Sequence, residues 1–224
     1  MAISGYMNRL PSAPVRETLA PVVRALHQSR RPVAYVGGGC LDASAAVTEI
    51  LDKTGIPTVQ TLMGLGSYPA SRPTAHGMLG MHGTVSANAA VDDADLLLAI
   101  GVRFDDRVTG KLENFAARAR IVHIDIDPAE IHKNKSAHVP VCADVRDALP
   151  VLNAMLDDDP VDTEQFADWR AALDEQRGSF PMRYPMRDDV IIPQWAIEVR
   201  LHGHSCACWW ADFGLRSAHA KLVC

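Results

Sequence analysis

The 224-residue sequence lacks any long hydrophobic run and any strong excess of one charge. No segment approaches the roughly 20 consecutive apolar residues that a membrane-spanning helix needs. The first fourteen residues contain neither the apolar core of a secretory signal nor an Arg- and Ser-rich amphipathic presequence. With a net charge of −5, the chain has no general basic attraction for nucleic acid or membrane surfaces. We therefore expect a soluble chain with no nucleic-acid partner, no membrane partner and no targeting segment.

Cysteine is scarce and irregularly placed. The five cysteines form an odd set without the spacing of a disulfide framework, which favours a reducing compartment. They are Cys40, Cys142, Cys206, Cys208 and Cys224.

The sequence also lacks the common catalytic motifs. It contains no P-loop, no Gly-x-Ser-x-Gly nucleophile elbow and no His-Glu-x-x-His zinc-protease helix. Within residues 30–157, no Ser or Cys stands beside a base that would activate it. We expect this part of the chain to hold a ligand rather than to transform a substrate by itself.

What the sequence does contain is an alternation of short apolar runs with helical segments. The runs lie in PVAYVGGGC (32–40), IPTVQTLMGLG (56–66), ADLLLAIGVRF (94–104), RIVHIDID (120–127) and HVPVCADV (138–145). The run in ADLLLAI is continuous, which is typical of a parallel strand covered by helices on both faces. The alternation predicts an α/β fold, with a doubly wound, mostly parallel sheet of five or six strands and helices on both faces.

Helix signals lie between these runs. The apolar spacing over 15–26 predicts a helix that ends before Pro32. Asp42 is expected to cap a helix that runs to about residue 54, and Thr84 a short helix through residue 90. Pro128 is expected at the first position of a further helix, and two more are expected up to about residue 156 and over 166–176.

Composition divides the chain into four parts. We expect a lead-in linker over 1–14, a compact domain over 15–157, a helix and linker over 158–199, and a tail of different composition over 200–224.

Glycines and charged residues gather where the strands are expected to end. Ligands of parallel sheets lie beyond these carboxyl ends. Glycine loops let backbone N–H groups approach a phosphate, an Arg fork binds it, and a strand-end carboxylate accepts ribose hydroxyls. The pattern predicts a nucleotide site. Its residues are Gly37, Gly38, Gly39, Gly64, Gly66, Gly101, Arg103, Asp105, Asp106, Arg107, Asp125 and Asp127.

Each of these features also has a purely structural explanation. A glycine triplet can serve a tight turn, Asp125 can cap a helix or lie in solvent, and the cluster at 105–107 can be a surface ion-pair loop. His82 can be a ligand or a structural hydrogen-bonding residue. GGGCLD (37–42) departs from the dinucleotide fingerprint, because Asp42 stands where a third glycine is expected, so a nicotinamide cofactor is not indicated.

Longer stretches carry a resemblance to a known family. They are RPVAYVGGGC, GIPTVQTLMGLGSYP, HGMLGMHGTVSANAAVDDADLLLAIGVRFDDRVTGKLENFA, RIVHIDIDPAEIHKNK and HVPVCADV. Together they resemble the central domain of the catalytic subunit of acetohydroxyacid synthase, also called acetolactate synthase. The resemblance covers residues 3–199 almost without gaps, and GMLGMHGT (77–84) and RFDDRVTG (103–110) are its most specific parts.

The resemblance implies a thiamine-diphosphate enzyme of valine, leucine and isoleucine biosynthesis. In that family pyruvate is decarboxylated, and its two-carbon unit is joined to a second pyruvate, giving 2-acetolactate and CO2, or to 2-oxobutanoate. The central domain binds FAD, whose role is mainly structural. Met81, Asp106 and Arg107 match positions near the family's substrate channel.

Carried over position by position, the resemblance gives this chain a set of FAD contacts, and it implies no catalytic residue and no metal ligand here. The contacts are Gly37, Gly38, Gly39, Thr61, Leu62, Leu79, Gly80, Met81, His82, Gly83, Gly101, Val102, Arg103, Asp105, Arg107, Val108, Asp125, Ile126, Asp144 and Val145.

The resemblance also implies what this chain does not supply. In the family, thiamine diphosphate and Mg²⁺ lie between a first domain, which brings an activating glutamate, and a third domain with a Gly-Asp-Gly motif. No Gly-Asp-Gly occurs in these 224 residues. We therefore expect a fragment without the first and third domains that is inactive alone, carries only part of the family's FAD pocket and exposes apolar interdomain surface.

Family members form homodimers or tetramers and bind a regulatory small subunit; they are plastid enzymes in plants and algae and cytoplasmic in bacteria. Two other functions remain open on the sequence. One is a stand-alone nucleotide-binding or decoy module, and the other is a different thiamine-diphosphate-dependent decarboxylase or oxidase.

The resemblance stops after Val199. The tail RLHGHSCACWWADFGLRSAHAKLVC (200–224) contains His202, His204, Cys206 and Cys208, which are zinc or copper ligand types, but their alternating spacing does not suit a tetrahedral site. We expect instead a frameshifted, misspliced or truncated end that is poorly ordered and exposes its Trp pair.

Overall fold

The computed structural model describes residues 11–181, 183–185 and 189–196. The chain divides into two units, Met1–Pro181 and Met182–Cys224, and the helices and strands named below belong to the first. In the second unit, the backbone N–H of Ala196 donates to the carbonyl of Ile192 at 3.1 Å, one turn of helix. The expectations for the tail over 200–224, including its possible metal ligands, lie outside the described residues.

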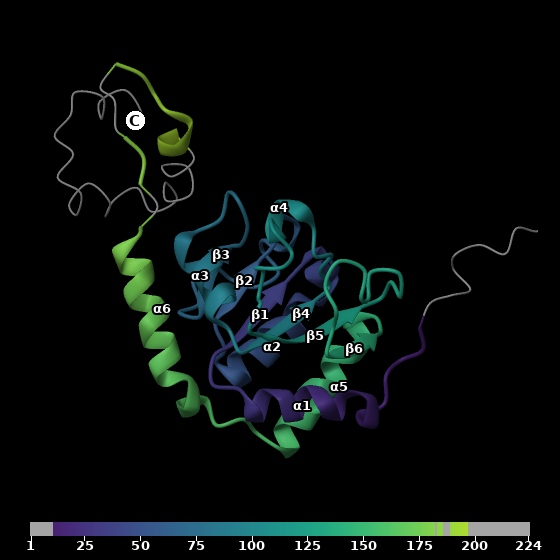
Figure 1. Ribbon diagram of the computed structural model, residues 1–224. Helices are drawn as coiled ribbons and strands as arrows, with labels where there is room; N and C mark the ends of the chain where they lie inside the picture. Colours follow the sequence, from purple (N-terminus) through teal and green to yellow (C-terminus); the bar gives the residue numbers. More distant parts are fainter. Residues whose placement is uncertain (1–10, 182, 186–188, 197–224) are drawn as a thin grey trace, which may run out of the picture. The chain divides into compact units, whose positions relative to one another are not determined.

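The first unit is built on a sheet of six strands in the order β3-β2-β1-β4-β5-β6, all parallel (Figure 1). The predicted α/β fold with a doubly wound parallel sheet is confirmed. The strands are β1 (Pro32–Val36), β2 (Thr58–Gln60), β3 (Ala75–Met78), β4 (Leu96–Ile100), β5 (Arg120–Asp125) and β6 (Val139–Cys142). The strand without an apolar run of its own is β3, AHGM, which lies at the sheet edge and is only partly buried.

Helices cover both faces of the sheet (Figure 1). One face packs against α1 (Arg16–Gln28), α2 (Ser44–Thr54) and α5 (Val145–Asp158), and the other against α3 (Val85–Asp93) and α6 (Ala167–Ser179). Each face of the sheet has its own hydrophobic core, and successive side chains of β4 point into different cores. Leu98 packs in the first core, with α1, α2 and α5, and Leu97 packs in the second, with α3 and α6. Both are fully buried, as expected for a central parallel strand. Shorter turns are η2 (Gly38–Ala43), η3 (Leu62–Gly64), α4 (Asp106–Thr109) and η4 (Thr163–Phe166).

Several predicted helix boundaries hold. Helix α2 ends at Thr54, where Gly55 adopts a left-handed φ of 62° and its N–H donates to the carbonyl of Leu51. Thr84 caps α3, since its hydroxyl accepts the N–H of Ala87 at 3.1 Å.

Two helix predictions were wrong. Asp42 caps nothing, because it lies inside the 3-10 turn η2 and the N-cap of α2 is Ala43. No helix follows Pro128. The carboxylate of Asp127 accepts the N–H of Ala129 at 2.9 Å in an Asx turn, and His132 has a φ of 64°, which a right-handed helix cannot include.

Helix α6 extends the first unit beyond the boundary expected near residue 157. Its Trp169 and Leu173 are buried in the second core, and the indole N–H of Trp169 donates to the carbonyl of Pro32 at 3.1 Å. The apolar face of α6 is therefore used against the sheet and α3, and this unit ends at Pro181.

Candidate nucleotide-binding site

The strand order places a topological switch point between β1 and β4. The chain runs outward from β1 to β2 and β3, then returns to the other side of β1 to form β4, β5 and β6. Connections leave the carboxyl ends of β1 and β4 in opposite directions, which opens a crevice at that edge. Every candidate nucleotide contact lies at the carboxyl end of a strand or in the segment that follows one.

The glycine loops after β1 and β4 pack directly on each other. The N–H of Gly37 donates to the carbonyl of Ile100 at 3.0 Å, and the N–H of Gly39 to that of Gly101 at 3.1 Å. A Cβ on Gly37 would lie 2.1 Å from the Gly101 oxygen, and Gly101 itself has a φ of 59°. These glycines are thus required by the contact between the two loops, whether or not a ligand is present. Gly38 instead faces Met63, whose Cβ lies 3.1 Å from the position of an added Cβ.

The two most specific motifs of the sequence meet in space. The N–H of Met81, in the loop after β3, donates to the carbonyl of Arg107 in α4 at 3.3 Å. Gly80 has a φ of 109°, and a Cβ there would come within 3.0 Å of the same carbonyl. Asn88 of α3 holds the Gly80 peptide on both sides, because its amide accepts the N–H at 3.2 Å and donates to the carbonyl at 3.1 Å.

The loop after β2 is fixed from within. Thr61 caps η3, its hydroxyl accepting the N–H of Gly64 at 2.9 Å. The buried Gln60 amide donates to the carbonyls of Gly64 and Tyr68 at 3.1 and 3.2 Å. Leu62 consequently projects outward, with 69% of its surface exposed.

Two of the candidate carboxylates act as helix caps. Asp105 accepts the N–H of Arg107 at the start of α4, and this hydrogen bond lowers the pKa of Asp105. Asp144 caps α5 and binds the guanidinium of Arg146, which lowers the pKa of Asp144. Both carboxylates therefore have a structural role in the protein itself.

Asp125 differs from these two. Its side chain is buried at the end of β5, and one oxygen accepts the N–H of Asp127 at 2.9 Å. The other oxygen lies 3.9 Å from Nε2 of His123, beyond hydrogen-bond distance. Burial raises the pKa of Asp125. Asp125 is thus neither a helix cap nor a solvated acid, the two structural alternatives left open by the sequence.

The cations and apolar side chains of this edge are exposed. The side chains of Arg103 and Arg107 are 71% and 78% exposed, and each lies 3.9 Å from a neighbouring carboxylate, too far for a hydrogen bond. The cluster at 105–107 is therefore only loosely paired. Met81, Ile126 and Leu62 are exposed apolar side chains of the same edge.

The structure brings the remaining candidates to the same edge. His82 is exposed, Gly83 packs against the carbonyl of Met78, and Leu79, Val102 and Val145 are buried beside their strands. Val108 is partly buried against the second core.

This donor set suits an extended nucleotide such as FAD. Two exposed guanidinium groups match a diphosphate, a carboxylate with one oxygen unbonded matches ribose hydroxyls, and exposed apolar side chains match a ring system. The residues that would hold the cofactor are Arg103, Arg107 and Asp125.

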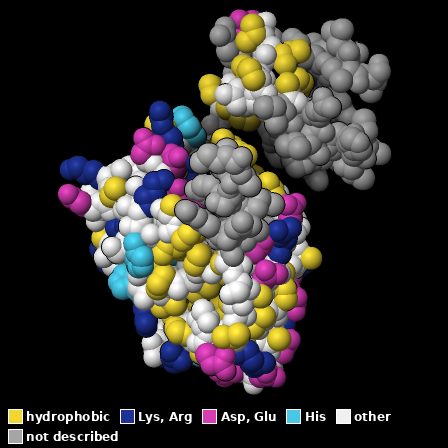
Figure 2. Space-filling model, turned by 90° about the vertical axis from the view of Figure 1, so that its right-hand side faces the viewer, with side chains coloured by type: hydrophobic (Ala, Val, Ile, Leu, Met, Phe, Trp, Pro, Cys, Tyr) yellow, Lys and Arg dark blue, Asp and Glu magenta, His cyan; other side chains and the backbone are white. Residues whose placement is uncertain are grey.

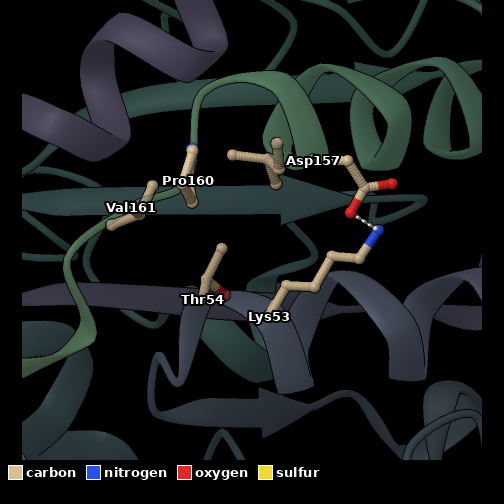
Figure 3. A pocket seen from close by; sticks show the side chains of 6 residues that line it. Lys53, Thr54, Asp157, Pro160 and Val161 are labelled. Atoms are coloured by element: carbon tan, nitrogen blue, oxygen red, sulfur yellow. Dashed lines mark ion pairs between the residues drawn. The ribbon is translucent and has the colours of Figure 1, made fainter.

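A cavity elsewhere in the unit does not belong to this site (Figure 3). It has a volume of about 180 Å³ and lies between the carboxyl ends of α2 and α5. Helices of a parallel α/β unit run opposite to their strands, so this cavity lies at the amino edge of the sheet. The ammonium of Lys53 pairs with Asp157 at 2.6 Å and with Glu49 at 2.7 Å, and it donates to the carbonyl of Asn153. No donor of Lys53 is left for a ligand.

A second cavity of about 240 Å³ lies between α3 and the segment after α4, where its walls include Leu79 and Val108. It therefore adjoins the candidate site from the side of the second core.

Sequence reasoning missed the residues that hold the site together. Asn88, Gln60 and His123 bind backbone groups of the edge loops through their side chains. One signal was present for His123, because a polar side chain two positions before Asp125 in an otherwise apolar strand faces the same side of the sheet.

Among the described residues, no helix has the length and apolar content needed to cross a membrane. Within the same part of the chain, no three His, Cys, Asp or Glu side chains are grouped so that they could hold a metal ion.

Figure 2 shows one face of the first unit. Exposed hydrophobic side chains occupy much of its middle, with acidic and basic side chains around them. Several large apolar side chains are exposed at the carboxyl edge: Leu41, Leu62, Met63, Leu65, Met81 and Ile126.

The sheet order and the edge loops define the class as a doubly wound α/β domain of the nucleotide-binding type. Residues 19–152 match the family model described as "Thiamine pyrophosphate enzyme, central domain". The chain belongs to this family; thiamine pyrophosphate is another name for thiamine diphosphate.

The chain is similar to acetolactate synthases of plants. It is 54% identical over 200 residues to "Acetolactate synthase 1, chloroplastic" of Zea mays, which covers 89% of this chain and 31% of that protein. It is 53% identical over 200 residues to "Acetolactate synthase 3, chloroplastic" of Brassica napus and 52% identical over 200 residues to "Acetolactate synthase, chloroplastic" of Arabidopsis thaliana, with 89% of this chain covered in both. The chain thus spans about a third of the length of these relatives.

Proposed function

We propose that residues 15–157, with α6, form the FAD-binding central domain of an acetolactate synthase. The observation that carries the proposal is the contact between the loop after β3 and α4 at the carboxyl edge of the sheet. The backbone N–H of Met81 donates there to the carbonyl of Arg107. Two exposed cations, Arg103 and Arg107, and the buried Asp125 lie at the same edge of the sheet.

In this proposal the chain's own residues bind and orient the cofactor. The guanidinium groups of Arg103 and Arg107 pair with the diphosphate, and the ionised carboxylate of Asp125 accepts the ribose hydroxyls. Leu62, Met81 and Ile126 cover apolar parts of the ligand and exclude water. FAD would act here as a structural group that completes the edge of the domain.

The activity we propose for the whole enzyme is the joining of a two-carbon unit from pyruvate to a second pyruvate or to 2-oxobutanoate. Thiamine diphosphate and Mg²⁺ would be held by parts of the enzyme other than the described residues. Homodimers or tetramers, a regulatory small subunit, and a plastid location in a plant or alga or a cytoplasmic one in a bacterium belong to the same proposal.

The test is a fluorescence titration of the purified chain with FAD, with FMN as the comparison ligand because FMN lacks the adenosine half. We expect saturable FAD binding that FMN does not reproduce. The variant Arg103→Ala should bind FAD about tenfold more weakly, as expected when a charge-assisted hydrogen bond is lost.

The matched control is Arg118→Ala. Arg118 is also exposed but precedes β5 at the opposite edge of the sheet, so its removal should leave FAD affinity unchanged. Absence of FAD binding by a folded wild-type chain, or an equal loss in both variants, would count against the proposed site.

A further inference from the structure

The loop that carries Arg103 is held by side chains from the neighbouring strand and its connection. Nε2 of His123, in β5, lies 2.9 Å from the carbonyl oxygen of Val102. The side-chain amide of Asn134, in the connection between β5 and β6, donates to the carbonyl of Phe104 at 2.8 Å. These two carbonyls stand on either side of Arg103 in the sequence.

The surroundings of His123 fix its ring as a hydrogen-bond donor through Nε2. Its side chain is completely buried, and its ring meets that of Phe104 edge-on with the centroids 5.0 Å apart. Burial lowers the pKa of His123, which favours the neutral ring, and a carbonyl partner requires the proton on Nε2. Nδ1, which then carries no proton, has no hydrogen-bond partner. Burying a polar ring costs folding free energy unless the ring is hydrogen-bonded. The bond to Val102 offsets this cost at Nε2.

We propose that His123 and Asn134 are positioning residues of the nucleotide site, which fix the backbone on both sides of Arg103 so that its guanidinium projects from the edge. The inference rests on the proposed function only in taking FAD as the ligand of this loop. The same ring nitrogen of His123 also lies 3.9 Å from the second oxygen of Asp125. The ring of His123 is thus close both to the loop that carries Arg103 and to the carboxylate of Asp125.

The first arm of the test is amide hydrogen exchange of the chain without ligand. In His123→Leu and Asn134→Ala, amides over 102–106 should exchange about fivefold faster or more, since each variant removes a hydrogen bond that restrains this loop. His123→Gln keeps an N–H donor at the end of the side chain and should restore slow exchange. Ser136→Ala, an exposed substitution in the same connection, should leave it unchanged.

The second arm is FAD affinity of the same variants. Asn134→Ala and His123→Leu should bind FAD about tenfold more weakly than the wild type, and His123→Gln and Ser136→Ala within about twofold of it. Asn134 is exposed, so this variant keeps the test decisive even where His123→Leu does not fold.

The two arms separate the inference from the proposed function. If the wild-type chain does not bind FAD, the proposed function is wrong. The exchange arm alone then decides whether His123 and Asn134 position the loop over 102–106. Unchanged exchange over 102–106 in folded Asn134→Ala and His123→Leu would overturn the inference, as would FAD binding that both variants retain at wild-type strength.

Discussion

At the scale of single residues, Asp125 stands out because it is buried and lacks a positive partner within hydrogen-bond distance. A carboxylate in this setting costs stability, as its raised pKa indicates, and such residues often serve a ligand.

We expect Asp125→Asn to weaken FAD binding about tenfold while leaving the free energy of unfolding at pH 7 unchanged or slightly higher, because the buried charge is removed. Asp144→Ala is the control. It should lower the free energy of unfolding by about 1 kcal/mol through loss of the α5 cap. Urea unfolding and FAD titration measure the two quantities. A large loss of stability in Asp125→Asn would show that the carboxylate is structural.

His76 gives the fold a pH dependence of its own. Its side chain is buried on β3, and burial, followed by the nearby charge of Arg177, lowers its pKa from 6.5 to about 4. The pKa of His76 is lower in the folded chain than in the unfolded chain. Between pH 6.5 and 4, the unfolded chain therefore binds a proton at His76 that the folded chain does not. Stability is therefore intact above pH 6.5 and is lost as the pH falls towards 4.

The loss from this residue should be on the order of 3 kcal/mol between pH 7 and pH 4. We expect His76→Gln to show a correspondingly shallower fall in the free energy of urea unfolding over this range, and His82→Gln, an exposed control, to behave like the wild type. His123 contributes in the same direction but is present in all three proteins. Parallel pH profiles for wild type and His76→Gln would refute the prediction.

The charged residues of the site were predicted from the sequence because their types and positions after apolar strands indicate chemistry directly. The residues that support them were not. His123 and Asn134 bind carbonyl groups 21 and 30 residues away, and Asn88 binds one 8 residues away. A sequence without the fold gives no sign of which carbonyl is near.

At the scale of elements, the contact between the loops after β1 and β4 is a tightly constrained feature of the carboxyl edge. The backbone of Gly101 occupies the space where a side chain at Gly37 or Gly39 would lie. Since Gly37 has an ordinary φ of −112°, the requirement for glycine there is one of space and not of backbone strain.

Gly37→Ala should therefore lower the free energy of unfolding by about 2–3 kcal/mol, the range of an overpacked site. Gly178→Ala is a control of opposite sign. Gly178 lies in the last turn of α6 with open space around it, so alanine there should be neutral or stabilising by up to about 0.5 kcal/mol. Thermal or urea unfolding distinguishes the two, and a Gly37→Ala protein as stable as the wild type would mean that the two loops separate easily.

Most elements could be predicted, and the exceptions have local causes. The strands with continuous apolar runs were predictable because both their faces are covered. β3 was not located, since its sequence AHGM has neither an apolar run nor alternation. The segment after Asp127 has a helix-like start with proline, but its backbone N–H groups bond within Asx and reverse turns instead.

At the scale of the whole molecule, the described helices and strands form one doubly wound α/β unit, for which we propose a binding role. The chain covers 31% of the length of its maize relative, and no Gly-Asp-Gly motif occurs in its sequence.

The 224-residue chain, incubated with pyruvate, thiamine diphosphate, Mg²⁺ and FAD, should form no acetolactate above a heat-denatured control. A full-length plant acetolactate synthase in the same assay serves as the positive control. Product that rises in proportion to the concentration of the pure chain would contradict the prediction.

The most direct test of the central claim is a map of backbone amide NMR shifts in the first unit upon addition of FAD. The account predicts that the perturbed amides cluster at 37–39, 61–62, 79–83, 101–108 and 125–126, while those around the Lys53–Asp157 cavity at the opposite edge stay unchanged. Perturbations centred on that cavity, or none at saturating FAD in a folded chain, would contradict it.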